Sequence, residues 1–360
     1  MRPGLRHSAA LLVLLLLGPA LAWGRPALVV YPGSFDPIHN THRAELGAVL
    51  DRLKAEHPDG VRALVLPQHD RPNHVPGNRY VFTALQRHFL ARQAFADRAE
   101  VSVRRAFPDG METADQLHRV AAAYGDSHDL YLLLGADAYQ GLRHWVRYHM
   151  VLSRFDLLVS VQPAALDKLP SPEGVLGTSG RAFRAAGDHD YAGGGRRIRY
   201  LPVDVPPVRS RAIVVNLMAG DPVDAWVPAA VAQAFALPPF AQAILQARRA
   251  TAHEMARLLA PFAGAEAARR LSADDRLAIP LLRVRPTTAP EQAREHLATF
   301  AAGVERSGTR VSLRALTAYA LSRAHQGLFL PPRPSERNPL LTWLRARTRG
   351  AAPAANEAHR

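Results

Sequence analysis

The sequence contains no cysteine, no recognisable internal repeat and no histidine spacing typical of a zinc site. Without cysteine, neither a disulfide nor a thiol nucleophile can form, and such a chain is compatible with oxidising and reducing compartments alike. Zinc requires several ligands that converge on one ion. We therefore interpret His69, His74 and His189 as solvated loop residues. Disulfide scaffolds, cysteine-based catalysis and zinc-finger motifs are excluded.

Apolar runs are also short, and the longest one lies near the N-terminus. Arg2 and Arg6 precede the apolar residues 9–17, and Ala20-Leu-Ala22 follows. A basic start, an apolar run and a small-x-small site are typical of a secretory signal peptide, and the run is shorter than a bilayer requires. We therefore expect a signal peptide at 1–22 and export to the periplasm or the extracellular space. A membrane anchor that is not cleaved and a misassigned start codon are the alternatives.

Positive charge is concentrated in the last third of the chain. Residues 241–360 contain 19 arginines and 9 acidic residues, so they carry +10 of the net charge of +14. This excess indicates a separate function or partner for the region. Anionic lipid, nucleic acid and an acidic protein each fit as an anionic partner of the basic C-terminal region. The alternative is that the arginines cover solvated helix faces.

Short apolar runs alternate with longer amphipathic stretches over the first two thirds of the chain. The runs occupy residues 27–31, 63–67, 101–103, 130–134, 157–161 and 198–203. This alternation predicts an α/β fold with a Rossmann-like parallel sheet and crossover helices, among them helices at 43–55 and 79–94. Residues 163–180 and 187–197 are rich in proline and glycine and are expected to form a surface excursion.

Beyond residue 237 the pattern is helical. Helices are expected at 240–259, 266–271, 289–307 and 312–325, and together they predict a C-terminal helical extension. We divide the chain into a signal peptide at 1–22, an α/β domain at 23–237, an arginine-rich helical extension at 240–347 and a mobile tail at 348–360.

The segment Tyr31-Pro-Gly-Ser-Phe-Asp-Pro-Ile-His-Asn-Thr-His42 joins the first predicted strand to the first predicted helix. His39 and His42 are three residues apart, and side chains at this spacing share a helix face. Helix N-termini attract phosphate through free N–H groups and the helix dipole. We expect both imidazoles to face one ligand, and two incidental histidines beside a strand–turn–helix are the alternative.

This segment resembles the nucleotide-binding signature of the nicotinate and nicotinamide mononucleotide adenylyltransferases, which belong to the nucleotidylyltransferase superfamily. The resemblance extends over residues 27–235. Further positions match the family motifs in order, namely Thr113, Asp115, Leu117, Gly135-Ala-Asp137 and Leu142-Arg-His-Trp145. A cytidylyltransferase or a coenzyme A precursor enzyme fits less well, because those families lack the Gly-Ala-Asp and tryptophan elements in this arrangement.

The resemblance implies adenylyl transfer from ATP to nicotinate or nicotinamide mononucleotide in NAD biosynthesis, with release of pyrophosphate. It also implies that Mg²⁺ accompanies ATP and that His39 and His42 are catalytic residues at the ATP phosphates. The implied ATP-binding residues are Gly33, Ser34, Phe35, Asp137, Ser210 and Arg211. The implied residues for the mononucleotide are Thr113 and Trp145, the latter stacking on the pyridine ring. An ordinary turn residue at Asp137 and a half-buried core tryptophan at Trp145 are the alternatives.

Among the departures from the family pattern, one bears directly on activity. Members carry Ile-Ser-Ser-Thr-x-Ile-Arg, whereas this chain reads Val208-Arg-Ser-Arg-Ala-Ile-Val214. The resemblance implies that the closing arginine contacts the ATP phosphates, and Val214 carries no charge. Arg209 and Arg211 lie close by in the sequence and offer a replacement. The alternative function is an exported, non-catalytic nucleotide-binding protein on the same fold, which predicted export favours because ATP is a cytoplasmic resource. The choice between nicotinate and nicotinamide and the oligomeric state stay open.

Overall fold

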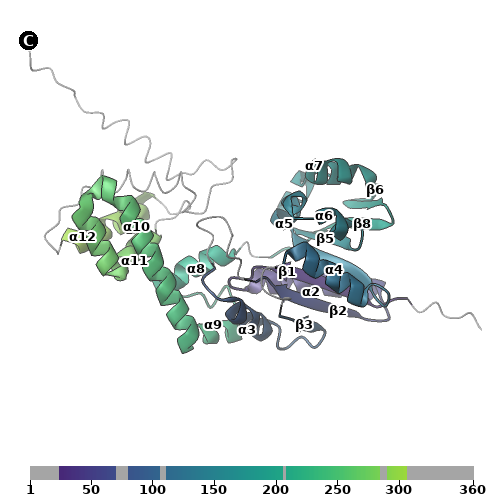
Figure 1. The fold of residues 1–360 in the computed structure, drawn as a ribbon, viewed down its shortest axis with the longest axis horizontal. Helices are drawn as coiled ribbons and strands as arrows, with labels where there is room; N and C mark the ends of the chain where they lie inside the picture. The colour runs from purple at the N-terminus through teal and green to yellow at the C-terminus, as the bar shows by residue number, and fades with distance from the viewer. Residues whose placement is uncertain (1–23, 70–79, 106–110, 206–207, 284–289, 306–360) are drawn as a thin grey trace, which may run out of the picture. The chain divides into compact units, whose positions relative to one another are not determined.

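The computed structural model describes residues 24–69, 80–105, 111–205, 208–283 and 290–305, which form two compact units (Figure 1). The sheet unit comprises Met1–Gly33, His42–His69 and Phe95–Val205, and the helical unit comprises Ser34–Thr41, Asp70–Ala94 and Pro206–Arg360. The predicted signal peptide, the predicted helix at 312–325, the tail at 348–360 and His74 lie outside the described residues.

An eight-stranded sheet forms the centre of the sheet unit, in the order β3-β2-β1-β4-β5-β8-β7-β6. Six of its strands are parallel: β1 (Ala27–Gly33), β2 (Val61–Pro67), β3 (Val101–Val103), β4 (Asp129–Gly135), β5 (Asp156–Val161) and β8 (Arg196–Pro202). They coincide with the six apolar runs, so the predicted Rossmann-like parallel sheet is confirmed. The strand order reverses between β1 and β4, which is where ligands bind in sheets of this kind.

The predicted surface excursion is mostly exposed, but it contains regular structure that the sequence did not predict. β6 (Arg184–Gly187) and β7 (Asp190–Gly193) form an antiparallel hairpin that pairs with β8. Gly194 and Gly195 have φ of 59° and 73°, a left-handed conformation that glycine adopts readily, so the glycine-rich run makes the turn into β8. The earlier part forms the short elements η2 (Pro163–Lys168), α7 (Pro172–Leu176) and η3 (Gly177–Ala182).

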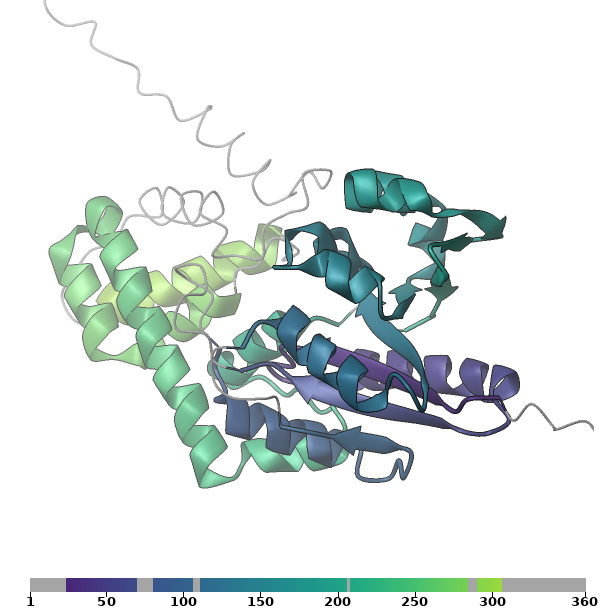
Figure 2. The same cartoon turned by 45° about the vertical axis from the view of Figure 1, so that its right-hand side comes forward.

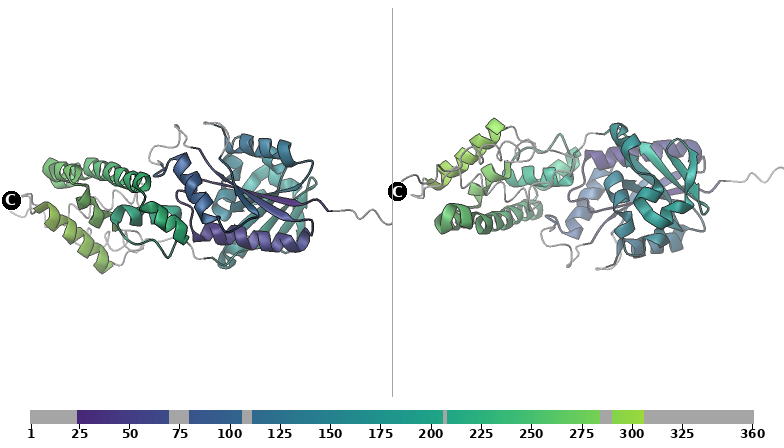
Figure 3. Two further views of the ribbon diagram at one scale, coloured as in Figure 1. Left: turned by 90° about the horizontal axis from the view of Figure 1, so that it is seen from below. Right: turned by 90° about the horizontal axis from the view of Figure 1, so that it is seen from above.

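Helices cover the parallel sheet on both faces. α2 (Asn40–Glu56) and α4 (Thr113–Tyr124) lie on opposite sides of it (Figure 3). Side chains alternate along a strand, so Leu28 and Val30 of β1 pack in the cluster on the α4 side, whereas the Tyr31 hydroxyl donates to Glu45 of α2. The short elements α5 (Ala136–Gln140), η1 (Leu142–His144) and α6 (Tyr148–Leu152) follow β4.

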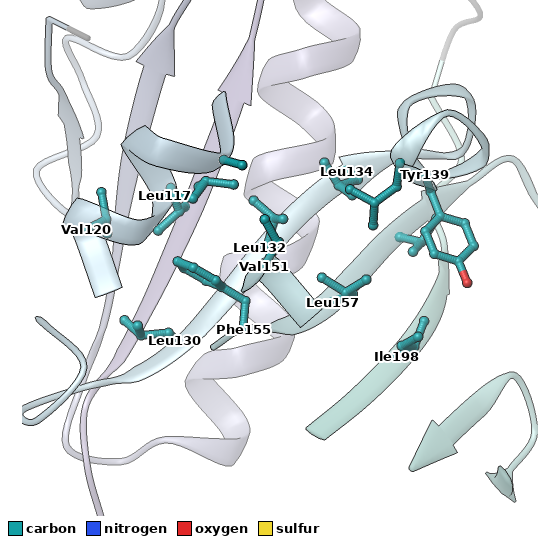
Figure 4. Packing of buried hydrophobic residues seen from close by; sticks show 14 of the residues in the cluster. Leu117, Val120, Leu130, Leu132, Leu134, Tyr139, Val151, Phe155, Leu157 and Ile198 are labelled. Carbon is teal, nitrogen blue, oxygen red and sulfur yellow. The ribbon is translucent and has the colours of Figure 1, made fainter. Parts of the chain in front are cut away.

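The main core of the sheet unit lies on the α4 side of the sheet (Figure 4). Leu117 and Val120 of α4 face Leu132 and Leu134 of β4, and Phe155 lies beside them, immediately before β5. Buried apolar area of this kind supplies most of the stability of such a layer.

The helical unit contains α3 (Ala84–Ala94), α8 (Ser210–Ala219), α9 (Ala229–Phe235), α10 (Pro238–Ala273), η4 (Asp275–Leu277), α11 (Ala278–Arg283) and α12 (Pro290–Glu305). α10 bends at Gly264, where φ is 88°, so that Ala267 and Leu271 share a core cluster with Ala252 and Met255 (Figure 2). Residue 264 is not helical (φ 88°, ψ 163°), so α10 consists of two helices joined at a kink, as the sequence predicted. The helix predicted at 79–94 begins at Ala84, after the chain around Val81 has bent.

Charge in the described part of the extension is nearly balanced. Between residues 241 and 305 the described residues include 8 arginines and 7 acidic residues, so 11 of the 19 arginines and 2 of the 9 acidic residues of the region lie outside the described part. Within it, Arg248 binds Asp275 at 2.7 Å and Arg283 binds Asp221 at 2.6 Å. The predicted anionic partner therefore depends mainly on residues that the structure does not describe. Among those it describes, no helix is long and apolar enough to span a membrane.

Replacing Phe155 tests the core of the sheet unit. Phe155→Ala leaves a cavity beneath α4 and is expected to lower the free energy of unfolding by about 3–5 kcal/mol, measured by urea denaturation. Phe89→Ala is the matched control, because that ring is 39% exposed and is expected to cost about 1 kcal/mol or less. Equal losses in the two variants would contradict the assignment of this core.

Candidate functional site

In the sheet unit, three of the predicted site residues lie at the carboxyl ends of the central strands. Gly33 is the last residue of β1, Asp137 stands in the first turn of α5 directly after β4, and His42 stands in the first turn of α2. The His42 ring meets the Tyr31 ring edge-on at a centroid distance of 6.3 Å. A Cβ atom at Gly135 would lie 3.1 Å from Asp137 Oδ1, so glycine at the end of β4 leaves room for this carboxylate.

Glu45 belongs to the same group of residues, although the sequence analysis did not select it. The Tyr31 hydroxyl donates to Glu45 Oε2 at 2.7 Å. Burial raises the pKa of Glu45, and the nearby Asp137 carboxylate raises it further, while the Tyr31 and Ser160 hydroxyls lower it. Burial, and then Glu45, raise the pKa of Tyr31, so its hydroxyl stays a neutral donor. The sequence signal that could have identified Glu45 is its spacing of three residues from His42, since residues at i and i+3 share a helix face.

The carboxylates at this edge suit a magnesium ion that arrives with a substrate. Among the residues that the structure describes, no group of three or more histidine, aspartate or glutamate side chains is placed to hold a metal. Mg²⁺ keeps several waters and is usually bound through one or two carboxylates plus substrate phosphates. Glu45 and Asp137, which interact electrostatically, are a donor set of that size.

Thr113 and Trp145 occupy a second region of the sheet unit. Thr113 begins α4 and is buried, and Gln68 donates to its hydroxyl from the end of β2 at 3.2 Å. Trp145 follows η1, is partly buried and packs against the core cluster. Arg147 donates to Asp115 of α4 at 2.6 Å, which ties the segment after Trp145 to the start of α4. The partial burial of Trp145 is the environment that the alternative of a half-buried core tryptophan describes.

In the helical unit, the segment Ser34–Thr41 carries Ser34, Phe35 and His39. Ser210, the first residue of α8, donates its hydroxyl proton to the Pro37 carbonyl at 2.9 Å. The Asn40 N–H donates to the Trp226 carbonyl at 2.9 Å. Phe35 is buried, so its ring packs inside the protein and only its backbone is placed to meet a ligand. The structure therefore brings Ser34, Phe35, His39 and Ser210 together within the helical unit.

His39 lies immediately before α2 with only 2% of its surface exposed. Burial lowers its pKa to about 4. The imidazole is therefore neutral at physiological pH and serves as a hydrogen-bonding group there, not as a cation.

Val214, which stands at the position of the family's phosphate-binding arginine, is part of a hydrophobic core. It is 8% exposed and packs in one cluster with Met218 of α8, Met255 of α10 and Phe300 of α12. Arg211, one turn earlier on α8, is exposed at its outer end, although partial desolvation lowers the pKa of its guanidinium; arginine nevertheless stays charged in proteins. Packing against the extension explains why an apolar residue occupies position 214.

The chain is similar in sequence to known nucleotidylyltransferases. A family model described as "Cytidylyltransferase-like" matches residues 30–186. The probable nicotinate-nucleotide adenylyltransferase of Chromobacterium violaceum is 28% identical over 207 residues, which are 56% of this chain and 92% of the relative. That of Helicobacter pylori is 30% identical over 137 residues, 37% of this chain and 72% of the relative. The Plasmodium falciparum nicotinic acid mononucleotide adenylyltransferase complexed with NaAD is 13% identical with a TM-score of 0.39, covering 59% of this chain and 94% of that one.

The lowered pKa of His39 predicts a specific dependence of stability on pH. The unfolded chain takes up a proton near pH 6.5 and the folded chain only near pH 4, so folding is progressively penalised as the pH falls between these values. Between pH 7 and pH 5 the wild type is expected to lose about 2 kcal/mol more than His39→Gln. Urea denaturation at both pH values measures this difference, and identical losses would contradict it.

The burial of Val214 predicts that replacing it with the family's arginine destabilises the protein. Val214→Arg places a charge in an apolar cluster and is expected to lower the free energy of unfolding by about 2–4 kcal/mol, without raising activity. Val214→Ile keeps the site apolar and serves as the control. Thermal unfolding compares the variants, and a Val214→Arg protein as stable as the wild type would show that position 214 is not in a core.

Proposed function

Because the chain belongs to the nucleotidylyltransferases of the nicotinate-nucleotide adenylyltransferase type, we propose that it transfers the adenylyl group of ATP to nicotinate mononucleotide in NAD synthesis, with nicotinamide mononucleotide as a second acceptor to be tested. The observation that carries this proposal is the position of the Gly33–His42 motif, which lies between the end of β1 and the start of α2. The names of the relatives support the pyridine mononucleotide as acceptor.

In this reaction a 5′-phosphate oxygen of the mononucleotide attacks the α-phosphorus of ATP. The bond to the β-phosphate oxygen breaks, and pyrophosphate leaves with the electron pair of that bond. The acceptor is already ionised, so the protein need not remove a proton or form a covalent intermediate. Its tasks are to align the reactants and to stabilise the charge that develops on the phosphate oxygens.

The start of α2 supplies the groups for these tasks. The N-terminal turn of this 17-residue helix carries the positive end of the helix dipole, which favours negative charge. His39 donates a hydrogen bond as a neutral imidazole, and His42 contacts the phosphates from the first helical turn. Mg²⁺ bound to ATP would neutralise the charge on its outer phosphates. Within the helical unit, Arg211 at the start of α8 carries a positive charge one turn from position 214, where the family has an arginine.

The mononucleotide is assigned to the region of Thr113 and Trp145. The Thr113 hydroxyl, held by Gln68, provides a polar contact, and the indole face suits a planar pyridine ring. The partial burial of Trp145 limits the orientations of the indole, which reduces the entropy that ring stacking would otherwise cost.

His42→Ala is expected to abolish adenylyl transfer while the fold is kept. The assay uses MgATP with either mononucleotide and measures pyrophosphate release, and a loss of about 100-fold or more is expected for a residue at the reacting phosphates. His118→Ala on the exposed face of α4 is the matched control and should keep wild-type activity.

Two results would count against the proposal. An active His42→Ala protein would remove that residue from the catalytic site. A wild-type protein that binds MgATP but releases no pyrophosphate with either mononucleotide would overturn the transferase activity itself.

A further inference from the structure

We propose that Arg87 and Asp36 are positioning residues that hold the backbone of Ser34 and Phe35 in the conformation that receives ATP. This inference deepens the proposed function and rests on it. Both residues belong to the helical unit.

Arg87 is a guanidinium with no solvent exposure, although it stands on a helix whose neighbouring residues Leu85 and Phe89 are exposed. Its Nη1 donates to the Ser34 carbonyl at 2.7 Å, and its Nε donates to the Phe82 carbonyl at 3.0 Å. The guanidinium carbon lies 4.0 Å from the centre of the Tyr80 ring. One planar group thus joins the segment after β1 to the segment before α3.

Asp36 makes the reciprocal connection. Its two carboxylate oxygens accept the N–H groups of Val81 at 2.8 Å and of Phe82 at 2.9 Å. Hydrogen bonds that involve a charged partner are about twice as strong as neutral ones. Ser34 and Asp36 are therefore both bound to residues 81–87, one through a carbonyl that accepts and the other through a carboxylate.

Phe35, between these two anchored residues, has a φ of 46°. This is the left-handed region, which a phenylalanine adopts only when its surroundings hold it there. Releasing either neighbour would let Phe35 return to an ordinary conformation, and the backbone N–H groups before His39 would turn with it. Ligand sites need such groups to be set in advance, because ordering them on binding costs affinity.

Packing alone does not explain a buried arginine at position 87. Removing a guanidinium from water is costly, and an apolar residue of similar length often stabilises a core equally well or better. What an apolar residue cannot do is donate to two carbonyls at once in a fixed plane. We infer that the charge is present for this geometry.

The experiment compares Arg87→Met with Arg199→Met. Arg199 is the matched control, because it is also buried at 9% exposure and binds both Glu56 oxygens at 2.8 and 2.7 Å, yet belongs to β8 in the sheet unit. Calorimetric titration with MgATP is expected to show a Kd raised by about tenfold or more in Arg87→Met, relative to the wild type. In Arg199→Met the Kd is expected to stay within about twofold of the wild-type value. The KM for the mononucleotide should stay within about threefold in both, since its site is assigned to other residues.

Milder variants keep the test decisive if methionine prevents folding. Arg87→Lys retains one donor and is expected to restore part of the ATP affinity, and Asp36→Asn weakens both accepted bonds and is expected to reduce it. A folded Arg87→Met or Asp36→Asn protein that binds MgATP as tightly as the wild type would overturn the inference.

Hydrogen exchange separates this inference from the proposed function. The peptide that covers residues 33–41 is expected to exchange faster in Arg87→Met than in Arg199→Met, whether or not the protein is active. Unchanged exchange there would overturn the positioning role. A wild-type protein that neither binds MgATP nor releases pyrophosphate would overturn the proposed function, and the exchange result would still decide the role of Arg87.

Discussion

The pairing of β1 with β2 on one side and with β4 on the other is the constraint on which the sheet unit depends. Because the strand order reverses at this pair and parallel crossovers are right-handed, α2 and α4 must cover opposite faces. The carboxyl ends of β1 and β4 then lie side by side at one edge of the sheet, which neither helix covers. Asp137 follows the end of β4 by two residues and His42 follows the end of β1 by nine. Their proximity to Tyr31 and Glu45 is therefore a consequence of strand order.

The segment that follows β1 depends on a different set of contacts. Its own sequence does not favour the left-handed conformation of Phe35, and its hydrogen bonds go to residues 45 to 186 positions away in the chain, on the segments around Val81, Ser210 and Trp226. Local structure here is imposed by distant parts of the helical unit. The backbone conformation of such a segment is well defined because several independent hydrogen bonds hold it at once.

The C-terminal extension is connected to the family architecture through α8. Val214 and Met218 of that helix lie in the same cluster as residues of α10, α11 and α12. The helix α8, which carries the last nucleotidylyltransferase motif, therefore also contributes side chains to the hydrophobic core of the extension. An arginine at position 214 is incompatible with this packing, since its charge would have to be buried.

Much of this protein was determined by the sequence alone. Short apolar runs with longer amphipathic stretches between them can be buried only as a parallel sheet with crossovers, and the six strands lie where the runs predict. The Gly33–His42 motif identified the family, because its residues are consecutive and need no tertiary contact to be recognised. Only the tertiary structure decided the roles of Glu45, Arg87 and Val214. These roles depend on burial and on contacts with residues far away in the sequence. The periodicity of a helix or strand specifies which face a residue occupies, but not which other element covers that face.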